Sequence, residues 1–111
     1  MSTLTIYAAA TAASDGTTIP HPVYDSRAVE SFTVIADNLG AGEEVDIYIL
    51  SGATYIVAKD LNGVAYKLAG TSGSNNSPML VLEGGPAYQF RKDTTAGACG
   101  IYVIEGRGVT A

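Results

Sequence analysis

The feature that most constrains the fold is a series of short runs rich in β-branched and aromatic residues, each ended by Gly, Asn, Asp or Pro. Apolar and polar residues alternate within several runs, which is the period of a half-buried β-strand. No stretch of adequate length carries the 3.6-residue period of a capped amphipathic helix. The pattern therefore predicts an all-β fold without a substantial helix. The expected strands lie at residues 3–9, 29–36, 44–51, 53–58, 64–69, 79–83, 86–91 and 98–105.

The alternation also predicts which side chains form the core. In four runs the expected inward-facing residues are Phe32, Val34 and Ala36; Val45, Ile47 and Ile49; Val64, Tyr66 and Leu68; and Tyr88 and Phe90. The last run differs, because Tyr102 and Ile104 oppose Ile101 and Val103, so that both of its faces are apolar. Alternation of this kind is typical of antiparallel sheets with one buried face.

Turn residues separate the runs at clear positions. Asn62-Gly63, between two runs, is a strong hairpin signal, and Gly52 permits a tight reversal. About eight strands joined by Gly- and Pro-rich loops favour a β-sandwich or a barrel, and a single jelly-roll-like β-sandwich is our first choice. The length agrees, since a chain of 111 residues forms about one domain.

The N-terminal part of the chain differs from the rest. The segment from Ala10 to Pro22 is small, polar and ends in proline, which is typical of an extended arm or linker. We therefore expect an N-terminal arm and linker over residues 1–28 and the β-sandwich domain over residues 29–111. Two interpretations of the alternating run at 3–9 remain open. It pairs with the sheet edge of a neighbouring subunit, or it is the first strand of its own sheet.

The charge pattern argues against several classes of partner. The net charge is −5, and the six basic residues are dispersed. Nucleic acid and anionic membranes require clustered basic side chains, whereas the only basic pair, Arg91-Lys92, is followed by Asp93. No run approaches the roughly 20 apolar residues of a transmembrane helix. We therefore expect no nucleic-acid partner and no membrane partner.

The residues that catalysis and metal binding require are scarce. Cys99 is the only cysteine and His21 the only histidine, so the chain supplies neither an intrachain disulfide nor three or four metal ligands of suitable type. A Ser-His-Asp triad would have to use His21, and no Gly-x-Ser-x-Gly motif is present. The densest acidic group, Glu43, Glu44 and Asp46, fits a solvated strand face better than a pair of catalytic carboxylates. We expect no enzymatic activity, no cofactor and no metal.

The layout of residues 29–106 resembles a known family. The stretch VESFTVIADNLGAGEEVDIYIL consists of a strand, an Asn-Leu-Gly-x-Gly-Glu loop and a second strand, and EGGPAYQFRK precedes a final Gly-rich strand. This order is similar to the small capsid decoration, or cement, proteins of tailed bacteriophages. In length and layout it most resembles the staple proteins on the capsids of epsilon15-like phages.

The resemblance implies a jelly-roll-like structural protein on the outer surface of the capsid in the virion. Such proteins bridge neighbouring capsomers and stabilise the shell against the pressure of packaged DNA. The implied partners are the major capsid protein and other copies of the chain, as a homodimer or, alternatively, a trimer. The alternative function is a glycan-binding β-sandwich module of a phage head or tail fibre, since the seven tyrosines offer rings that stack on sugars.

The candidate contact residues lie in the N-terminal run, in the loops 37–42 and 70–78, and at the basic pair. Loops at the ends of a sandwich commonly carry contacts, and the basic pair is a candidate to meet acidic groups on a shell. The residues expected to contact the capsid or a second subunit are Leu4, Ile6, Tyr7, Asp37, Asn38, Leu39, Asn75, Asn76, Arg91 and Lys92.

Overall fold

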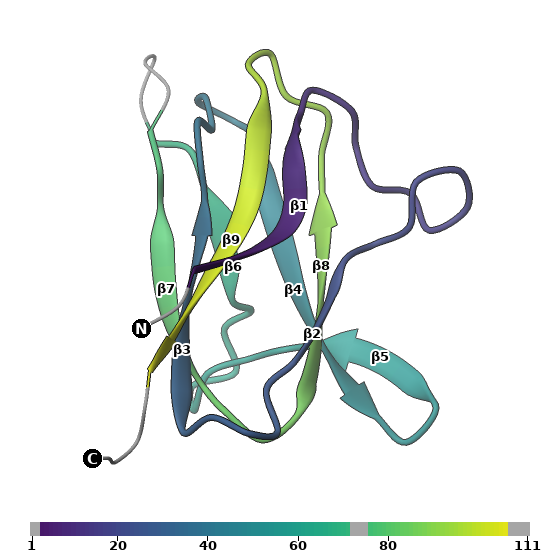
Figure 1. The fold of residues 1–111 in the computed structure, drawn as a ribbon, viewed down its shortest axis with the longest axis vertical. Coiled ribbons are helices and arrows are strands. Elements are labelled where there is room, and N and C mark those ends of the chain that lie inside the picture. Colours follow the sequence, from purple (N-terminus) through teal and green to yellow (C-terminus); the bar gives the residue numbers. More distant parts are fainter. Residues whose placement is uncertain (1–2, 72–75, 107–111) are drawn as a thin grey trace.

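The computed structural model describes residues 3–71 and 76–106, and in these ranges the chain forms nine strands and no helix (Figure 1). The all-β prediction is therefore confirmed. The strands are β1 (Thr3–Ala10), β2 (Val23–Asp25), β3 (Ser31–Ala36), β4 (Glu44–Ser51), β5 (Thr54–Val57), β6 (Lys67–Ala69), β7 (Met79–Glu83), β8 (Ala87–Lys92) and β9 (Cys99–Gly106).

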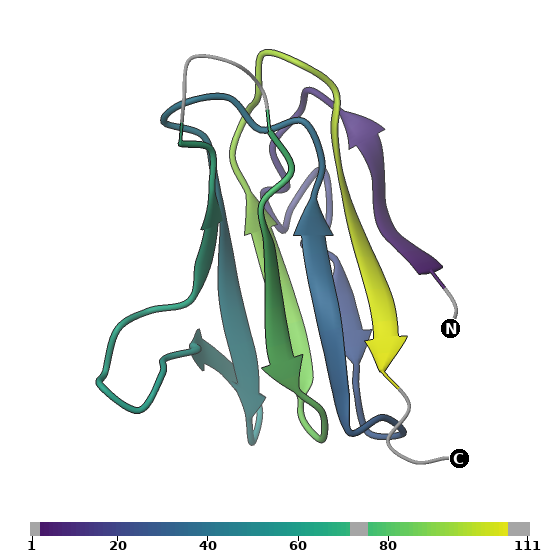
Figure 2. The ribbon, with the colours of Figure 1, turned by 90° about the vertical axis from the view of Figure 1, so that its left-hand side faces the viewer.

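The strands form two antiparallel sheets that pack face to face (Figures 1 and 2). The four-stranded sheet has the order β1-β9-β3-β7. The five-stranded sheet has the order β2-β8-β4-β5, and β6 also pairs with β4. Apart from the run from β4 to β6, successive strands alternate between the two sheets. This is the connectivity of a jelly roll, as the sequence predicts.

The core forms largely where the alternation predicts it. Phe32, only 1% exposed, lies between two aromatic rings. Its ring centroid is 4.8 Å from that of Tyr24 and 5.1 Å from that of Tyr88, both in edge-to-face geometry. Such pairs add about 1 kcal/mol each beyond the burial of area. The other buried residues among those expected to face inward are Val34, Ala36, Val45, Ile47, Leu68 and Phe90. In the last run, Ile101 and Val103 are the side that is buried.

The connection around Asn62-Gly63 differs from the predicted hairpin. A turn does form, with Gly63 at a φ of 80° and its N–H donating to the carbonyl oxygen of Asp60 (3.0 Å). Lys59 and Ala65 also form an antiparallel bridge across this turn, so the hairpin exists locally. However, it does not extend into β5 and β6, which both pair with β4, at its residues 48–51 and 44–46 respectively. Val64 is exposed instead of inward-facing. The turn signal is local, whereas the choice of partner strand depends on the long edge of β4.

The first 28 residues also differ from the expected arm and linker. β1 pairs with β9 in this chain's own sheet, which is the second of the two interpretations of the run at 3–9. β2 pairs with β8 at the edge of the other sheet, and Ser14, between the two strands, is buried. A strand of three residues is too short for its alternation to be recognised in the sequence.

The side chain of Lys92 fixes the connection between β1 and β2. Lys92 is only 2% exposed, and its Nζ donates to the carbonyl oxygens of Ala12 (2.7 Å) and Asp93 (3.2 Å) and to Oγ1 of Thr95 (3.3 Å). Burial lowers the pKa of the Lys92 ammonium. An ammonium has three donors, so these three acceptors satisfy it and allow the charge to lie inside the protein.

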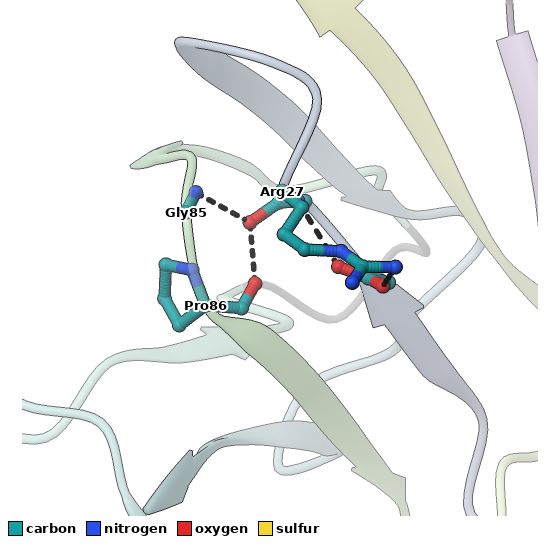
Figure 3. A network of polar contacts seen from close by, with 5 residues as sticks. Arg27, Gly85 and Pro86 are labelled. Atoms are coloured by element: carbon teal, nitrogen blue, oxygen red, sulfur yellow. Dashed lines mark hydrogen bonds and ion pairs between the residues drawn. The ribbon is translucent and has the colours of Figure 1, made fainter.

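A second polar network closes the opposite end of the sandwich, at the turn between β7 and β8 (Figure 3). Oγ of Ser26 donates to the carbonyl oxygen of Pro86 (2.5 Å) and accepts the N–H of Gly85 (3.0 Å). Gly84 is required here, because a β-carbon at this position would collide with the carbonyl oxygen of Val29. The network joins the β2–β3 connection to this turn.

Candidate contact surfaces

The outer face of the four-stranded sheet lacks charge across its centre. Directly opposite residues of antiparallel strands point to the same side, so the strand register defines two rows across the sheet. The rows are Thr3–Ile104–Thr33–Val81 and Thr5–Tyr102–Ile35–Met79. All eight residues are at least partly exposed, and Met79 and Val81 are 62% and 65% exposed. We call these eight residues the apolar face.

The outer face of the five-stranded sheet carries charged side chains. The register places Asp46 of β4 beside Arg91 of β8 on one side and Lys67 of β6 on the other. Glu44 forms an exposed ion pair with Lys67 (3.3 Å), and the guanidinium of Arg91 lies 3.7 Å above the ring of Tyr48. We call Glu44, Asp46, Lys67 and Arg91 the charged face.

The candidate residues of the N-terminal run are used mainly within this chain. Leu4 lies opposite the buried Val103 and is 37% exposed. Ile6 and Tyr7 pack against the core, and the Tyr7 hydroxyl donates to the carbonyl oxygen of Ala12 (2.9 Å). The side chains that β1 contributes to the apolar face are those of Thr3 and Thr5.

The two candidate loops meet at one end of the sandwich. Leu39 and Asn76 exchange two backbone hydrogen bonds of 2.7 Å, which join the loops to each other. Asp37 is exposed and Asn38 partly exposed beside this bridge. Asn75 lies outside the residues that the structure describes. The loops therefore present one joint surface.

Two of the candidate residues are not at the surface. Leu39 is fully buried, and Lys92 is held inside the protein by its three hydrogen bonds. The alternation along β8 turns Arg91 outward and Lys92 inward, so only Arg91 of the basic pair is available to a partner. The structure therefore removes Leu39 and Lys92 from the candidate contact residues.

The sequence does not predict the apolar face, although it contains one indication of it. The run 98–105 is apolar on both sides, and its outer residues, Tyr102 and Ile104, form the middle of the face. The residues that complete the face, such as Thr33 and Val81, come from strands far apart in the sequence. Their grouping depends on the register of four strands, which no local pattern defines.

The seven tyrosines divide among the core and the two faces. Tyr24 and Tyr88 are buried, and Tyr7 and Tyr66 pack against the core. Tyr102 belongs to the apolar face, while Tyr48 and Tyr55 are partly exposed on the five-stranded sheet. A platform of stacked rings for sugars is therefore not favoured over a surface for protein contact.

The chain's single imidazole contacts a hydroxyl. Oγ of Ser14 lies 2.8 Å from Nδ1 of His21 and also accepts the backbone N–H of Lys92 (3.0 Å). Oδ1 of the neighbouring Asp15 accepts the N–H groups of residues 17–19. Burial lowers the pKa of His21, and the nearby charge of Arg91 lowers it further. The contact closes the loop between Ser14 and His21 and buries the hydroxyl.

Residues 3–71 and 76–106 contain no group of three His, Cys, Asp or Glu side chains placed to hold a metal ion. In the same part of the chain, no helix has the length and hydropathy needed to span a bilayer. Cys99 is fully buried, and burial raises the pKa of its thiol.

Fold and surfaces together define a small jelly-roll β-sandwich. No protein-family model matches the chain, and no curated protein matches it. Among solved structures, the crystal structure of the SPBc2 prophage-derived protein YomS is similar, with a TM-score of 0.59 and 13% sequence identity. The similarity covers 92% of this chain and 88% of that chain. It shows that the two proteins share a fold.

Proposed function

We propose that this chain is a structural protein of a tailed-phage virion that binds the outer surface of the head and bridges neighbouring capsomers. The apolar face carries the proposal. It gathers eight uncharged side chains on one side of a small protein, whereas the opposite side combines the charged face with the exposed Val23, Leu50 and Val57. Contiguous apolar surfaces of this kind mark sites of protein contact. The partners are the major capsid protein and a second copy of the chain.

Two further observations support this proposal. The fold is shared with a protein encoded by a prophage, and the layout of residues 29–106 resembles capsid decoration proteins. The net charge of −5 suits the outside of a shell better than its interior, where packaged DNA would repel it. A protein present in many copies can reinforce a shell through individually weak contacts, because multivalent attachment multiplies them.

Co-sedimentation with capsids stripped of their small proteins tests the proposal. We expect saturable binding at a fixed number of copies and a shell that withstands higher temperature. A chain that stays in the supernatant at all concentrations would contradict the proposed function.

A matched pair of variants tests the surface. Met79→Asp places a charge on the apolar face (Met79 is 62% exposed), whereas Val23→Asp changes another exposed strand residue (46%), on the five-stranded sheet. We expect Met79→Asp to weaken capsid binding roughly tenfold and Val23→Asp less than about twofold. Equal losses in both variants would show that the apolar face is not the contact surface.

A further inference from the structure

Within residues 3–71 and 76–106, strand β7 has a partner strand along only one of its two edges. It is the outer strand of the four-stranded sheet, and the N–H of Gly84, just after it, donates to the carbonyl oxygen of Glu30 (2.8 Å). Hydrogen-bonded pairs alternate along an antiparallel ladder, so the even-numbered residues of β7 face β3. The N–H and C=O groups of Met79 and Val81 therefore point away from the sheet. A hydrophobic edge without Lys or Pro invites pairing with another strand.

The free edge borders a cleft of about 680 Å³. Figure 2 shows the reason: β4 and β6 extend beyond β7, so part of the five-stranded sheet has no strand opposite it. Ile56 of β5 lies opposite Ile49 on the inward side of this sheet, and yet it is 50% exposed. The apolar lining consists of Ile49, Ile56, Ala58, Tyr66, Leu82 and Tyr88.

The shape of this region favours a single strand over a second copy of the chain. The five residues of β7 span about 17 Å, which a short extended segment matches. If β7 paired with β7 of a second copy, both five-stranded sheets would lie on the same side of the joined sheet. Their projecting strands would then compete for the same space. An extended segment brings no second sheet and fills the cleft without this collision.

Charges at the rim of the cleft favour a segment with a basic residue. Glu83 is exposed at the end of β7, and Lys59 and Asp60 lie on the rim across from it. Among the described residues, none of these three takes part in an ion pair. Glu83 and Asp60 outnumber Lys59, so the rim carries a net negative charge. A Lys or Arg of the bound segment, placed beside Glu83, would balance this charge.

We propose that the free edge of β7 and this cleft form an acceptor site for one extended segment of another protein, which adds as a fifth strand to the four-stranded sheet. The backbone groups of Met79 and Val81 bind the segment's backbone. Apolar side chains at alternate positions of the segment enter the cleft, and a Lys or Arg lies beside Glu83. Strand addition of this kind draws affinity from the backbone and specificity from the alternate side chains. The acceptor site adjoins the apolar face, because Met79 and Val81 belong to both and Val81 also lines the cleft, but it does not rest on the function proposed above.

The test uses the full chain and a nine-residue peptide in which Val and Thr alternate, with a Lys at each end. Two control peptides carry N-methyl groups, one at all Val positions and the other at all Thr positions. In an extended strand these two sets of N–H groups point to opposite edges. We expect the unmodified peptide to bind in calorimetry and one of the two methylated peptides to bind at least about tenfold more weakly.

Variants of the chain locate the bound peptide. Ile56→Asp, inside the cleft, should weaken peptide binding roughly tenfold, whereas Leu50→Asp, on the other face of the same hairpin and 38% exposed, should change it less than about twofold. Val81→Pro removes an N–H of the free edge and should also abolish binding, while Val23→Asp, at the edge of the five-stranded sheet, should leave it within about twofold. Circular dichroism confirms that each variant is folded.

Several results would overturn the acceptor site. They are the absence of binding at about 1 mM unmodified peptide, equal binding by both methylated peptides, or equal losses in Ile56→Asp and Leu50→Asp. These results leave the capsid experiment unaffected, because that experiment depends on Met79→Asp and Val23→Asp. The two proposals therefore fail separately.

Discussion

The two outer faces of the sandwich are built from similar strands but differ in chemistry. Across the four-stranded sheet, opposite residues combine threonine with Ile, Val, Met or Tyr, and none of the eight is charged. Across the five-stranded sheet, Asp46 lies between Arg91 and Lys67. Charged side chains keep the face of a sheet solvated and disfavour its association with other proteins, whereas an uncharged face favours such association. For this reason the proposed capsid contact is assigned to the four-stranded sheet.

The largest effect on stability is expected from a comparison of two neighbouring residues of β8, Arg91 on the charged face and Lys92 in the interior. Lys92→Ala leaves a cavity and removes the donor from the carbonyl oxygens of Ala12 and Asp93. We expect it to lower the free energy of unfolding by about 3 kcal/mol in urea titrations at pH 7. Arg91→Ala should cost less than about 1 kcal/mol, since its side chain lies at the surface. Similar losses in both variants would mean that the buried ammonium contributes no more than a surface charge.

A smaller effect is expected for the salt dependence of capsid binding, which should differ between the apolar face and the charged face. Binding to capsids through the apolar face should change less than about twofold between 50 and 500 mM NaCl, because burial of uncharged surface is not screened. Binding through the charged face would weaken several-fold over the same range. Sedimentation at the two salt concentrations distinguishes these outcomes, and a steep loss would move the contact to Arg91 and its neighbours.

The smallest effect is expected for the pH dependence of stability, which Asp46 and the neighbouring carboxylate of Glu44 influence on the charged face. Burial raises the pKa of Asp46, and the nearby Glu44 adds to the shift. The folded state then binds a proton more readily than the unfolded state, so ionised Asp46 costs stability at neutral pH, and this cost disappears as the pH falls below about 3.9. Asp46→Asn should therefore raise the free energy of unfolding at pH 7 by about 0.3 kcal/mol, and the gain should vanish at pH 3.

A variant on the same face provides the control for this prediction. Glu44→Gln removes the ion pair with Lys67 and should lower stability at pH 7 by a similarly small amount. A loss of stability in Asp46→Asn at pH 7 would show that the attraction of Arg91 and Lys67 outweighs burial and the neighbouring acids.

The sequence predicts those parts of the fold that depend on local periodicity. The burial of Phe32 and Phe90 and the outward position of Arg91 follow from alternation within single strands. Other features depend on contacts between distant segments and have no local signal. They are the pairing of β5 and β6 with β4, the three-residue strand β2 and the burial of Lys92. Nζ of Lys92, for example, reaches a carbonyl oxygen 80 residues away. The apolar face belongs to the same group, because it exists only once four strands are in register.

The hydrogen bond between Lys92 and Ala12 has a consequence for how this protein can diversify. The acceptor belongs to the main chain, so the bond constrains the path of the backbone and not the identity of the residue at position 12. Ala8, Ala9 and Thr11 beside it are exposed. Related sequences can therefore keep this segment in place while its side chains change, so that its surface can vary with little effect on the stability of the fold.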